Sequence, residues 1–249
     1  MIRVRGLQKS FGDVQALKNV EFHVNRGEIV ALLGGNGSGK STSINILTGL
    51  LKPDEGSVDI QGINPFNDPI EARKKIGVFP DKPGLFNYLT VKEHLAFFAA
   101  LHGMEGKKKR EAVDRTLSML GMEDIANRIS KGFSHGQSVK LALGRAMVHS
   151  PDYLIMDEPT RGLDVFAVRN VREILLRLRD SGTGILFSSH VMQEVELLAN
   201  RVAVIADGEV HTEGPPLSLI EETRTSNLED AFIAIVRKSS AAITDGRQE

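Results

Sequence analysis

A glycine-rich loop constrains this chain more strongly than any other feature of its sequence. Residues 34–41, GGNGSGKS, place four glycines within six positions and end in Lys40 and Ser41. A short apolar run (28–33) precedes the loop, and a segment with helical periodicity (41–50) follows it. Glycine in regular structure costs roughly 0.5–1 kcal/mol relative to alanine, so such a cluster indicates a special backbone path. The order strand, glycine loop, helix predicts an α/β fold.

The loop fits the pattern G-x-x-x-x-G-K-[ST], which is typical of a phosphate-binding site. In such a loop, backbone N–H groups surround phosphate oxygens and the helix N-terminus adds positive potential. We expect Lys40 to reach the outer phosphates and Ser41 to coordinate Mg²⁺. The predicted phosphate site comprises Gly34, Gly35, Asn36, Gly37, Ser38, Gly39, Lys40, Ser41 and Thr42.

Two carboxylates follow a second apolar run. Asp157 and Glu158 come directly after YLIM (153–156), at the predicted C-terminal end of a parallel strand. That edge of a parallel sheet faces the ligand crevice, where Asp157 can hold the metal shell and Glu158 can orient or deprotonate water. Without Lys40 the simpler interpretation is a strand that exits into solvent.

Composition excludes several classes of protein. The 249 residues include 31 Lys+Arg and 32 Asp+Glu, and the net charge of −1 argues against a general nucleic-acid coat. A hydrophobic content of 41% indicates a globular chain, and the absence of cysteine excludes disulfides and thiol chemistry. No stretch has the apolar length of a membrane span, and the first 13 residues lack the apolar core of a signal peptide. We expect a soluble chain.

Hydrophobic periodicity predicts the order of elements. Alternating residues in 2–7 and 20–24 indicate antiparallel strands, and short strands are expected at 56–60 and 75–79 with a turn between them. Capping boxes predict helices after Thr90 with Glu93 and after Ser134 with Gln137, and a third helix is expected after Gly106. Residues 153–206 alternate strand and helix, and a hairpin turn follows at 207–208.

These patterns predict one domain over 1–249 with three parts. Residues 1–81 and 151–237 form a core that includes the antiparallel strands, and 82–150 form a helical insertion. The last predicted helix places Leu228, Phe232 and Ile235 on one face, and a frayed tail is expected over 238–249.

Six motifs in order along the chain resemble the ATP-binding subunits of ABC transporters. They are Phe11-Gly12, GGNGSGKST (34–42), FSHGQ (133–137), YLIMDEP (153–159), RGLD (161–164) and FSSH (187–190). The resemblance implies a P-loop NTPase with a RecA-like parallel sheet, helices on both faces, an antiparallel β subdomain and a helical subdomain. It also implies ATP and Mg²⁺ as cofactors and ATP hydrolysis as the activity.

The resemblance assigns further residues to the site. In that family two subunits dimerise head to tail and enclose two ATP molecules. It implies that Phe11 stacks on adenine, that Glu158 is the catalytic carboxylate, and that His190 touches the γ-phosphate and the attacking water. The partner subunit's γ-phosphate would be contacted by Ser134, Gly136 and Gln137, and Asp164 would organise the dimer contact.

Two departures from the family pattern stand out. The segment KIGVFPD places Asp81 where most members have a glutamine that senses Mg²⁺; a shorter carboxylate can still bind metal-bound water. The segment FSHGQ has His135 where glycine is commonest and Phe133 where leucine is. Neither removes the serine or the second glycine, so we expect ATP binding to survive.

The leading hypothesis is an ATPase that powers transport through a separate transmembrane permease. Residues 83–95, 188–210 and 227–232 look like small bacterial exporters of ions, drugs or antibiotics. We expect a second ATP-binding subunit in a homodimer, no nucleic-acid partner, a position on the cytoplasmic face of the membrane, and a groove beside 82–105 that transmits movement. The alternatives are a soluble ABC-type ATPase acting on nucleic acid, ribosomes or a protein assembly, and a regulatory domain that only binds nucleotide.

Several residues have simpler interpretations. Phe11 alone would be a core residue, and Ser134 and Gln137 are explained as a helix cap. The basic run 107–110 is typical of a solvated helix start. No metal-ligand spacing connects His94, His102, His149 and His211.

Overall fold

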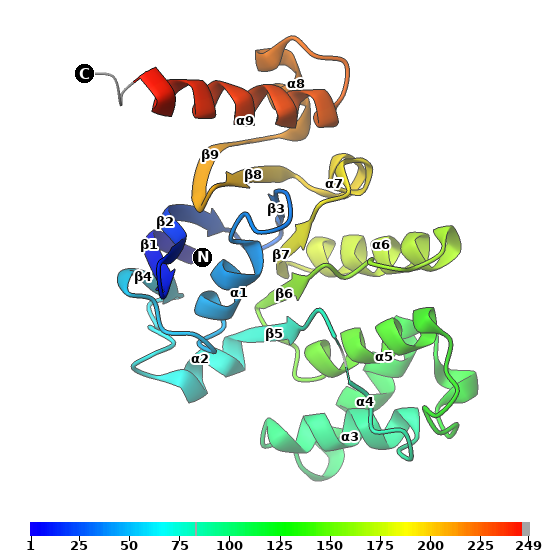
Figure 1. Cartoon of the computed structure of the whole chain (residues 1–249). Coiled ribbons are helices and arrows are strands. Elements are labelled where there is room, and N and C mark those ends of the chain that lie inside the picture. Colours follow the sequence, from blue (N-terminus) through cyan, green and yellow to red (C-terminus); the bar gives the residue numbers. More distant parts are fainter. Residues whose placement is uncertain (83, 246–249) are drawn as a thin grey trace.

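The computed structural model describes residues 1–82 and 84–245, which form one mixed sheet with helices on both faces (Figure 1). Within these residues the strand order is β4-β1-β2-β9-β8-β3-β7-β6-β5. Strands β3, β5, β6, β7 and β8 pair in parallel, whereas β1 pairs antiparallel with β2 and β4. The strands are β1 (Ile2–Phe11), β2 (Val14–Val24), β3 (Ile29–Leu33), β4 (Glu55–Ile60), β5 (Ile76–Phe79), β6 (Tyr153–Asp157), β7 (Gly184–Ser189), β8 (Arg201–Ala206) and β9 (Glu209–Gly214).

Among the residues that the structure describes, the α-helices fall into three groups along the chain. Two accompany the N-terminal strands, three form a layer after β5 at the bottom of Figure 1, and four cover the sheet or its far end. They are α1 (Lys40–Leu47), α2 (Pro69–Lys75), α3 (Val91–Leu101), α4 (Gly106–Leu120), α5 (His135–Met147), α6 (Val165–Asp180), α7 (Met192–Leu198), α8 (Pro216–Thr223) and α9 (Leu228–Asp245). We call α3, α4 and α5 the helical layer.

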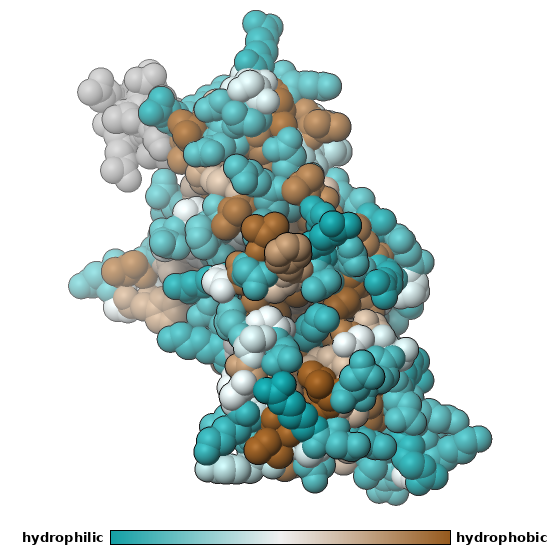
Figure 2. All heavy atoms as spheres, turned by 90° about the vertical axis from the view of Figure 1, so that its right-hand side faces the viewer, coloured by the Kyte–Doolittle hydropathy of each residue, from teal (hydrophilic) through white to brown (hydrophobic). Residues whose placement is uncertain are grey.

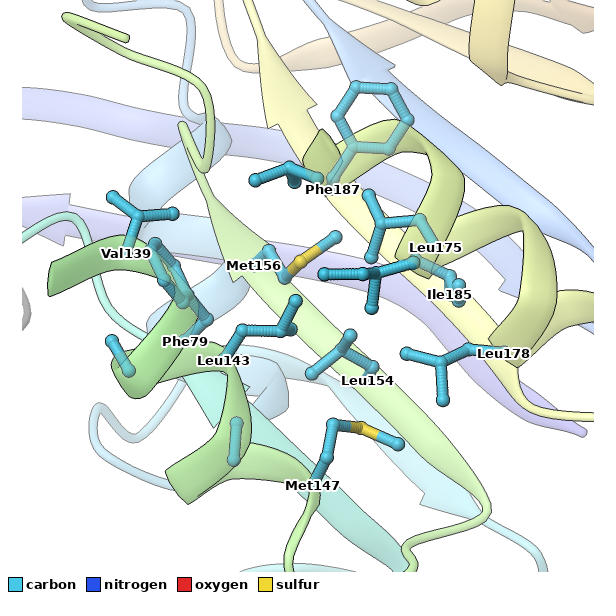
Figure 3. Packing of buried hydrophobic residues seen from close by; sticks show 14 of the residues in the cluster. Phe79, Val139, Leu143, Met147, Leu154, Met156, Leu175, Leu178, Ile185 and Phe187 are labelled. Atoms are coloured by element: carbon cyan, nitrogen blue, oxygen red, sulfur yellow. The ribbon is translucent and has the colours of Figure 1, made fainter. Parts of the chain in front are cut away.

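The parallel strands are buried on both faces, which explains why their sequences are continuously apolar. In β3, Ile29, Ala31 and Leu33 join one hydrophobic core, and Val30 and Leu32 join the other. The first core holds the helical layer against the sheet. Figure 3 shows it, with α5 and α6 meeting β6 and β7 through Leu143, Met147, Leu175, Leu178, Leu154, Met156, Ile185 and Phe187.

Local sequence signals set the helix starts in the helical layer. Both predicted capping boxes are confirmed: the Thr90 hydroxyl accepts from the Glu93 N–H at 3.2 Å, and the Ser134 hydroxyl accepts from the Gln137 N–H at 3.2 Å. Helix α4 begins at Gly106, as expected. These caps fix where the helices begin before tertiary packing is considered.

The hairpin prediction is also confirmed. Asp207 and Gly208 join β8 to β9 with φ angles of 50° and 77°. Two consecutive positive φ angles define the type I′ turn that Asp-Gly favours, because its twist matches that of the flanking strands.

Two predicted details are wrong. The stretch predicted as a turn before 75–79 contains α2, which is capped where the Asp68 carboxylate accepts from the Glu71 N–H at 3.3 Å and which has Pro69 in its first turn. Seven residues are too few to show periodicity. The frayed tail predicted for 238–249 is instead helical as far as Asp245, because no glycine or proline interrupts α9; 246–249 lie outside the described residues.

Within the described residues, no helix combines the length and apolar character needed to cross a bilayer. On the face drawn in Figure 2, hydrophilic side chains predominate and hydrophobic ones lie in separate groups among them.

Candidate active site

A cavity of about 430 Å³ lies at the C-terminal edge of the parallel strands. Its wall brings together segments that are far apart in sequence: the end of β1, the phosphate loop with α1, the second residue after β5, the end of β6 and the residue after β7. The lining residues are Phe11, Ala16, Asn36, Gly37, Ser38, Gly39, Lys40, Ser41, Thr42, Asp81, Asp157, Glu158, Arg161 and His190.

The phosphate loop needs glycine for two physical reasons. Gly37 and Gly39 have φ angles of 78° and 109°, in the region that side chains rarely allow. A Cβ at Gly34 would lie 2.3 Å from the Ile205 carbonyl oxygen, and one at Gly39 would lie 2.5 Å from Leu17 Cδ2. The glycines therefore let the loop fold tightly against β8 and β2 while its backbone faces the cavity.

The Lys40 side chain is buried and bound mainly to backbone carbonyls. The residue is 6% exposed, and Nζ donates to the carbonyl oxygens of Gly34 at 2.8 Å and Gly35 at 3.0 Å. Burial lowers the pKa of Lys40, and the nearby carboxylates of Glu158 and Asp157 oppose that effect. Among the described residues, Lys40 Nζ contacts only those two carbonyls and one distant carboxylate oxygen, Glu158 Oε1 at 3.8 Å; a buried cation with such partners fits a negatively charged ligand.

The loop also contains an unsatisfied hydroxyl. Ser38 Oγ is buried without a hydrogen-bond partner among the described residues. A Cβ at Gly34 would lie 2.6 Å from this oxygen, so the hydroxyl is packed against the start of the loop rather than exposed to the cavity.

Hydrogen bonds at the ends of β6 and β7 position the carboxylates of Asp157 and Glu158, and each carboxylate has a different partner. The Ser188 hydroxyl donates to Asp157 Oδ1 at 2.5 Å and accepts from the Glu158 N–H at 2.9 Å. Glu158 has a φ of 49°, a strained conformation that turns its side chain out of the strand. His190 Nδ1 lies 2.9 Å from both Glu158 carboxylate oxygens, and a carboxylate can only accept from it.

The oxygen atoms present fit Mg²⁺ together with phosphate. Ser41 and Asp157 offer a hydroxyl and a carboxylate, the hard ligands that Mg²⁺ prefers. No cluster of three or more His, Cys, Asp or Glu that could hold a metal alone occurs among the described residues. Mg²⁺ is commonly held by one or two carboxylates plus the phosphates of its substrate, which is the donor set this cavity offers.

Two further predicted residues line the cavity at its rim. Phe11 is 51% exposed at the end of β1, and Lys9 Nζ lies 5.8 Å from its ring centroid. An exposed aromatic face is available for stacking. Asp81 pairs with Arg161 through Oδ1 and Nη1 at 3.3 Å.

Six predicted residues do not line the cavity. Gly34 and Gly35 lie at the start of the phosphate loop, where their carbonyls accept from Lys40. The other four, which we call the signature cluster, are Ser134, Gly136, Gln137 and Asp164. Ser134 and Gln137 cap α5, and the Asp164 carboxylate caps α6 by accepting from the Ala167 N–H at 2.8 Å. A Cβ at Gly136 would lie 3.1 Å from Ala167 Cβ, so the two helix starts are neighbours. The chain therefore presents two separate groups of predicted site residues.

Sequence reasoning missed two residues that hold the site's carboxylates: Arg161, which lines the cavity, and Ser188, which is buried behind it. Ser188 holds Asp157 and the Glu158 backbone, and Arg161 pairs with Asp81. Both lie inside motifs singled out from the sequence, FSSH and RGLD, but a motif does not show which of its members faces the ligand.

Comparison with known proteins agrees with this geometry. A family model described as "ABC transporter" matches residues 17–161. The "ABC transporter ATP-binding protein NatA" of Bacillus subtilis (strain 168) is 36% identical over 94% of this chain and 97% of its own length. The "Linearmycin resistance ATP-binding protein LnrL" of the same organism is 32% identical over 98% of this chain and 81% of its own length.

Solved structures share the fold over nearly the whole chain. An ATP-binding subunit of an ABC transporter has a TM-score of 0.86 at 28% identity, covering 95% of this chain and 99% of that one. The protein cbiO1 of Clostridium perfringens, part of the transporter complex cbiONQ, has a TM-score of 0.81 at 30% identity, covering 89% and 90%. The chain has the P-loop α/β fold of these cassettes, and it belongs to the ABC transporter family as an ATP-binding ATPase subunit.

Proposed function

We propose that this chain hydrolyses Mg-ATP in the cavity described above and drives transport, in the export direction, through a separate membrane permease. One observation carries the proposal: Lys40, Asp157, Glu158 and His190, which lie far apart in sequence, converge on one cavity beside the glycine loop. A degenerate domain that only binds nucleotide has no need of the His190–Glu158 contact.

The proposed roles follow from the contacts. Lys40 exchanges the Gly34 and Gly35 carbonyls for phosphate oxygens, and residues 34–42 supply backbone N–H groups to the same phosphates. Phe11 stacks on the adenine ring. Ser41 and Asp157 hold Mg²⁺, which neutralises phosphate charge, and Asp81 contributes through a bound water.

Glu158 orients the attacking water. Its carboxylate is fixed by the contact with His190 and by the hydrogen bond from its own N–H to Ser188. Positioning and charge stabilisation account for most of the catalysis in phosphoryl transfer, so a fixed carboxylate beside the phosphates is sufficient for this role.

The signature cluster completes the site of a second copy. It lies outside the cavity of its own chain. Ser134, Gly136 and Gln137 sit at the start of α5, a helix of 13 residues whose N-terminus offers positive potential, and Asp164 sits at the neighbouring start of α6. A head-to-tail dimer places the start of α5 on the partner's γ-phosphate, with Asp164 organising the contact. A bacterial ABC transporter cassette with a TM-score of 0.76 to this chain has been solved as a dimer.

The permease docks where the helical layer meets β5. A groove of about 230 Å³ lies there, and the exposed Phe97 and Leu101 are the sequence neighbours of its lining residues Phe98 and His102. The groove is lined by Thr48, Leu50, Arg73, Ile76, Val78, Pro80, Phe98, His102, Ala142, Arg145, Ala146 and His149. We place the chain at the cytoplasmic face of the membrane, with 1–81 and 151–237 as the ATP-binding core and 82–150 as the transmitting part.

Purification from the native cell tests this function. The tagged chain is extracted from gently solubilised membranes, and proteins that co-purify in stoichiometric amount are identified by mass spectrometry, alongside an ATPase assay. A multi-span membrane protein is the expected partner. Ribosomal, nucleic-acid or solely soluble partners would replace the transport proposal with an ABC-type ATPase that moves another load.

A further inference from the structure

Two residues that depart from the family pattern are joined through Arg161. Asp81 follows β5, His135 begins α5, and Arg161 lies in the loop between β6 and α6. Asp81 Oδ1 lies 3.3 Å from Arg161 Nη1, and His135 Nε2 donates to the Arg161 carbonyl oxygen at 3.0 Å. Three segments are therefore connected by the side chain and the backbone of one residue.

The connection begins at the cavity and ends at the signature cluster. Asp81 and Arg161 both line the cavity, whereas His135 lies between Ser134 and Gly136 of the signature cluster. The loop that carries Arg161 is compact: the Arg161 N–H donates to the Glu158 carbonyl at 3.2 Å, and the Leu163 N–H donates to the Thr160 carbonyl at 3.1 Å. The loop backbone is thus held as a unit, and a shift of this loop moves the carbonyl that His135 binds.

The Asp81–Arg161 ion pair is weak enough to form and break. The two side chains are 34% and 66% exposed, and exposed ion pairs add little stability. Among the described residues, Asp81 is the only anionic partner found for the Arg161 guanidinium. A divalent cation placed near Asp81 attracts the same carboxylate oxygens, so the guanidinium and the metal compete for them.

We propose that Arg161 is a positioning residue that competes with Mg²⁺ for Asp81 and passes the state of that carboxylate to His135 at the start of α5. With Mg-ATP in the cavity, Asp81 turns from Arg161 toward the metal shell, and the released Arg161 loop shifts the hydrogen bond to His135. This inference rests on the proposed function, since it requires that the cavity bind Mg-nucleotide.

A double-mutant cycle tests the competition. The dissociation constant of a non-hydrolysable ATP analogue is measured in EDTA and in excess Mg²⁺ for the parent, D81N, R161Q and D81N/R161Q. We define the Mg²⁺ ratio as the dissociation constant in EDTA divided by that in Mg²⁺. A larger ratio means that Mg²⁺ strengthens binding more, and effects on the phosphates that do not depend on the metal cancel in it. R161Q is expected to raise the ratio about threefold, D81N to lower it, and R161Q to have no effect on it in the D81N background.

Two variants serve as controls. R161K keeps a cation beside Asp81 and should return the ratio toward the parent value. R169Q removes an exposed arginine whose Nε lies 3.2 Å from Glu173 Oε1 in α6, away from the cavity, and should leave the ratio unchanged.

The link to α5 has its own readout. In NMR spectra of the protein saturated with the analogue, the His135 ring signal, assigned by its loss in H135Q, should move when Mg²⁺ is added. The movement should be absent in R161Q and D81N, and a movement of full size in both would overturn the link. If R161Q leaves the Mg²⁺ ratio at the parent value, the competition is wrong, whereas a parent protein that binds no nucleotide would refute the proposed function itself.

Discussion

The cavity and the signature cluster are both built to meet phosphate, but they are built differently. In the cavity a buried lysine and two positioned carboxylates line one space beside the phosphate loop. In the signature cluster each polar side chain is already used: Ser134 and Gln137 satisfy α5, and Asp164 satisfies α6. The first region is prepared for a ligand within one chain, and the second offers a helix start that needs a ligand held by another.

The cavity and the signature cluster also differ in backbone strain. The cavity contains Glu158 with a positive φ and a loop in which Gly34 and Gly39 have no room for a Cβ. The signature cluster consists of ordinary capped helix starts. Strain collects at reacting groups because the surrounding fold must hold them in one geometry, while a docking surface has no such requirement.

The largest expected effect is on catalysis in the cavity. Glu158→Gln keeps the size of the side chain and removes the carboxylate charge that would orient water. Hydrolysis should fall by about 10²–10⁴-fold, the range for loss of a positioned acid or base. ATP binding should persist, and the variant should accumulate as a dimer in Mg-ATP, which light scattering can measure. A variant that stays monomeric in saturating Mg-ATP and hydrolyses at the parent rate would refute completion of the site by a second copy.

Nucleotide affinity should depend on Lys40 in the isolated subunit. Lys40→Ala removes a buried cation, and we expect an affinity loss of about 100-fold, or about 3 kcal/mol. Equilibrium binding of fluorescent ATP measures it, with circular dichroism as a check of folding. Lys52→Ala, at an exposed position outside the cavity, is the control. Equal affinity in the K40A variant and the parent would place the phosphates elsewhere.

Local patterns in the sequence predicted much of the cavity. The phosphate loop, the carboxylates after YLIM and both capping boxes are contiguous motifs, so their chemistry is visible without the fold. The Asp81–Arg161 pair joins residues 80 positions apart, and no local signal reveals it. Helix α2 was missed because it depends on one cap and one proline rather than on periodicity. Contacts set by the topology, and elements shorter than two turns, required the structure.

The helical layer should make the stability of the protein sensitive to acid. Burial lowers the pKa of His149 from 6.5 to about 4, with a further contribution from His102, whose ring is stacked on it at 3.5 Å. Arg73 and Arg145 line the same groove. The unfolded chain therefore takes up a proton near pH 6.5 that the folded chain refuses until about pH 4, and stability falls as pH falls through that window.

The expected loss from this group is about 2 kcal/mol between about pH 7 and pH 5. Denaturant unfolding at a series of pH values measures it. His149→Gln, which keeps a polar side chain but cannot titrate, should flatten the curve. The slope that remains should have the same sign, because burial also lowers the pKa values of His94 and His102. An H149Q curve as steep as that of the parent would show that His149 is not the group responsible.

The smallest expected effect on the isolated subunit is the loss of the α5 cap, and it tests most directly whether the signature cluster has a role separate from the cavity. Ser134→Ala removes the cap of α5 and should cost about 1 kcal/mol of stability. Thr90→Ala removes the matching cap of α3 in the same helical layer and should cost the same. ATP affinity at low protein concentration should be unchanged in both, because neither residue lines the cavity. Only S134A should weaken ATP-driven dimerisation and hydrolysis, since only that hydroxyl would meet the γ-phosphate of a second copy. Equal loss of dimerisation in T90A would assign the effect to the stability of the helical layer, and the signature cluster would then have no separate role.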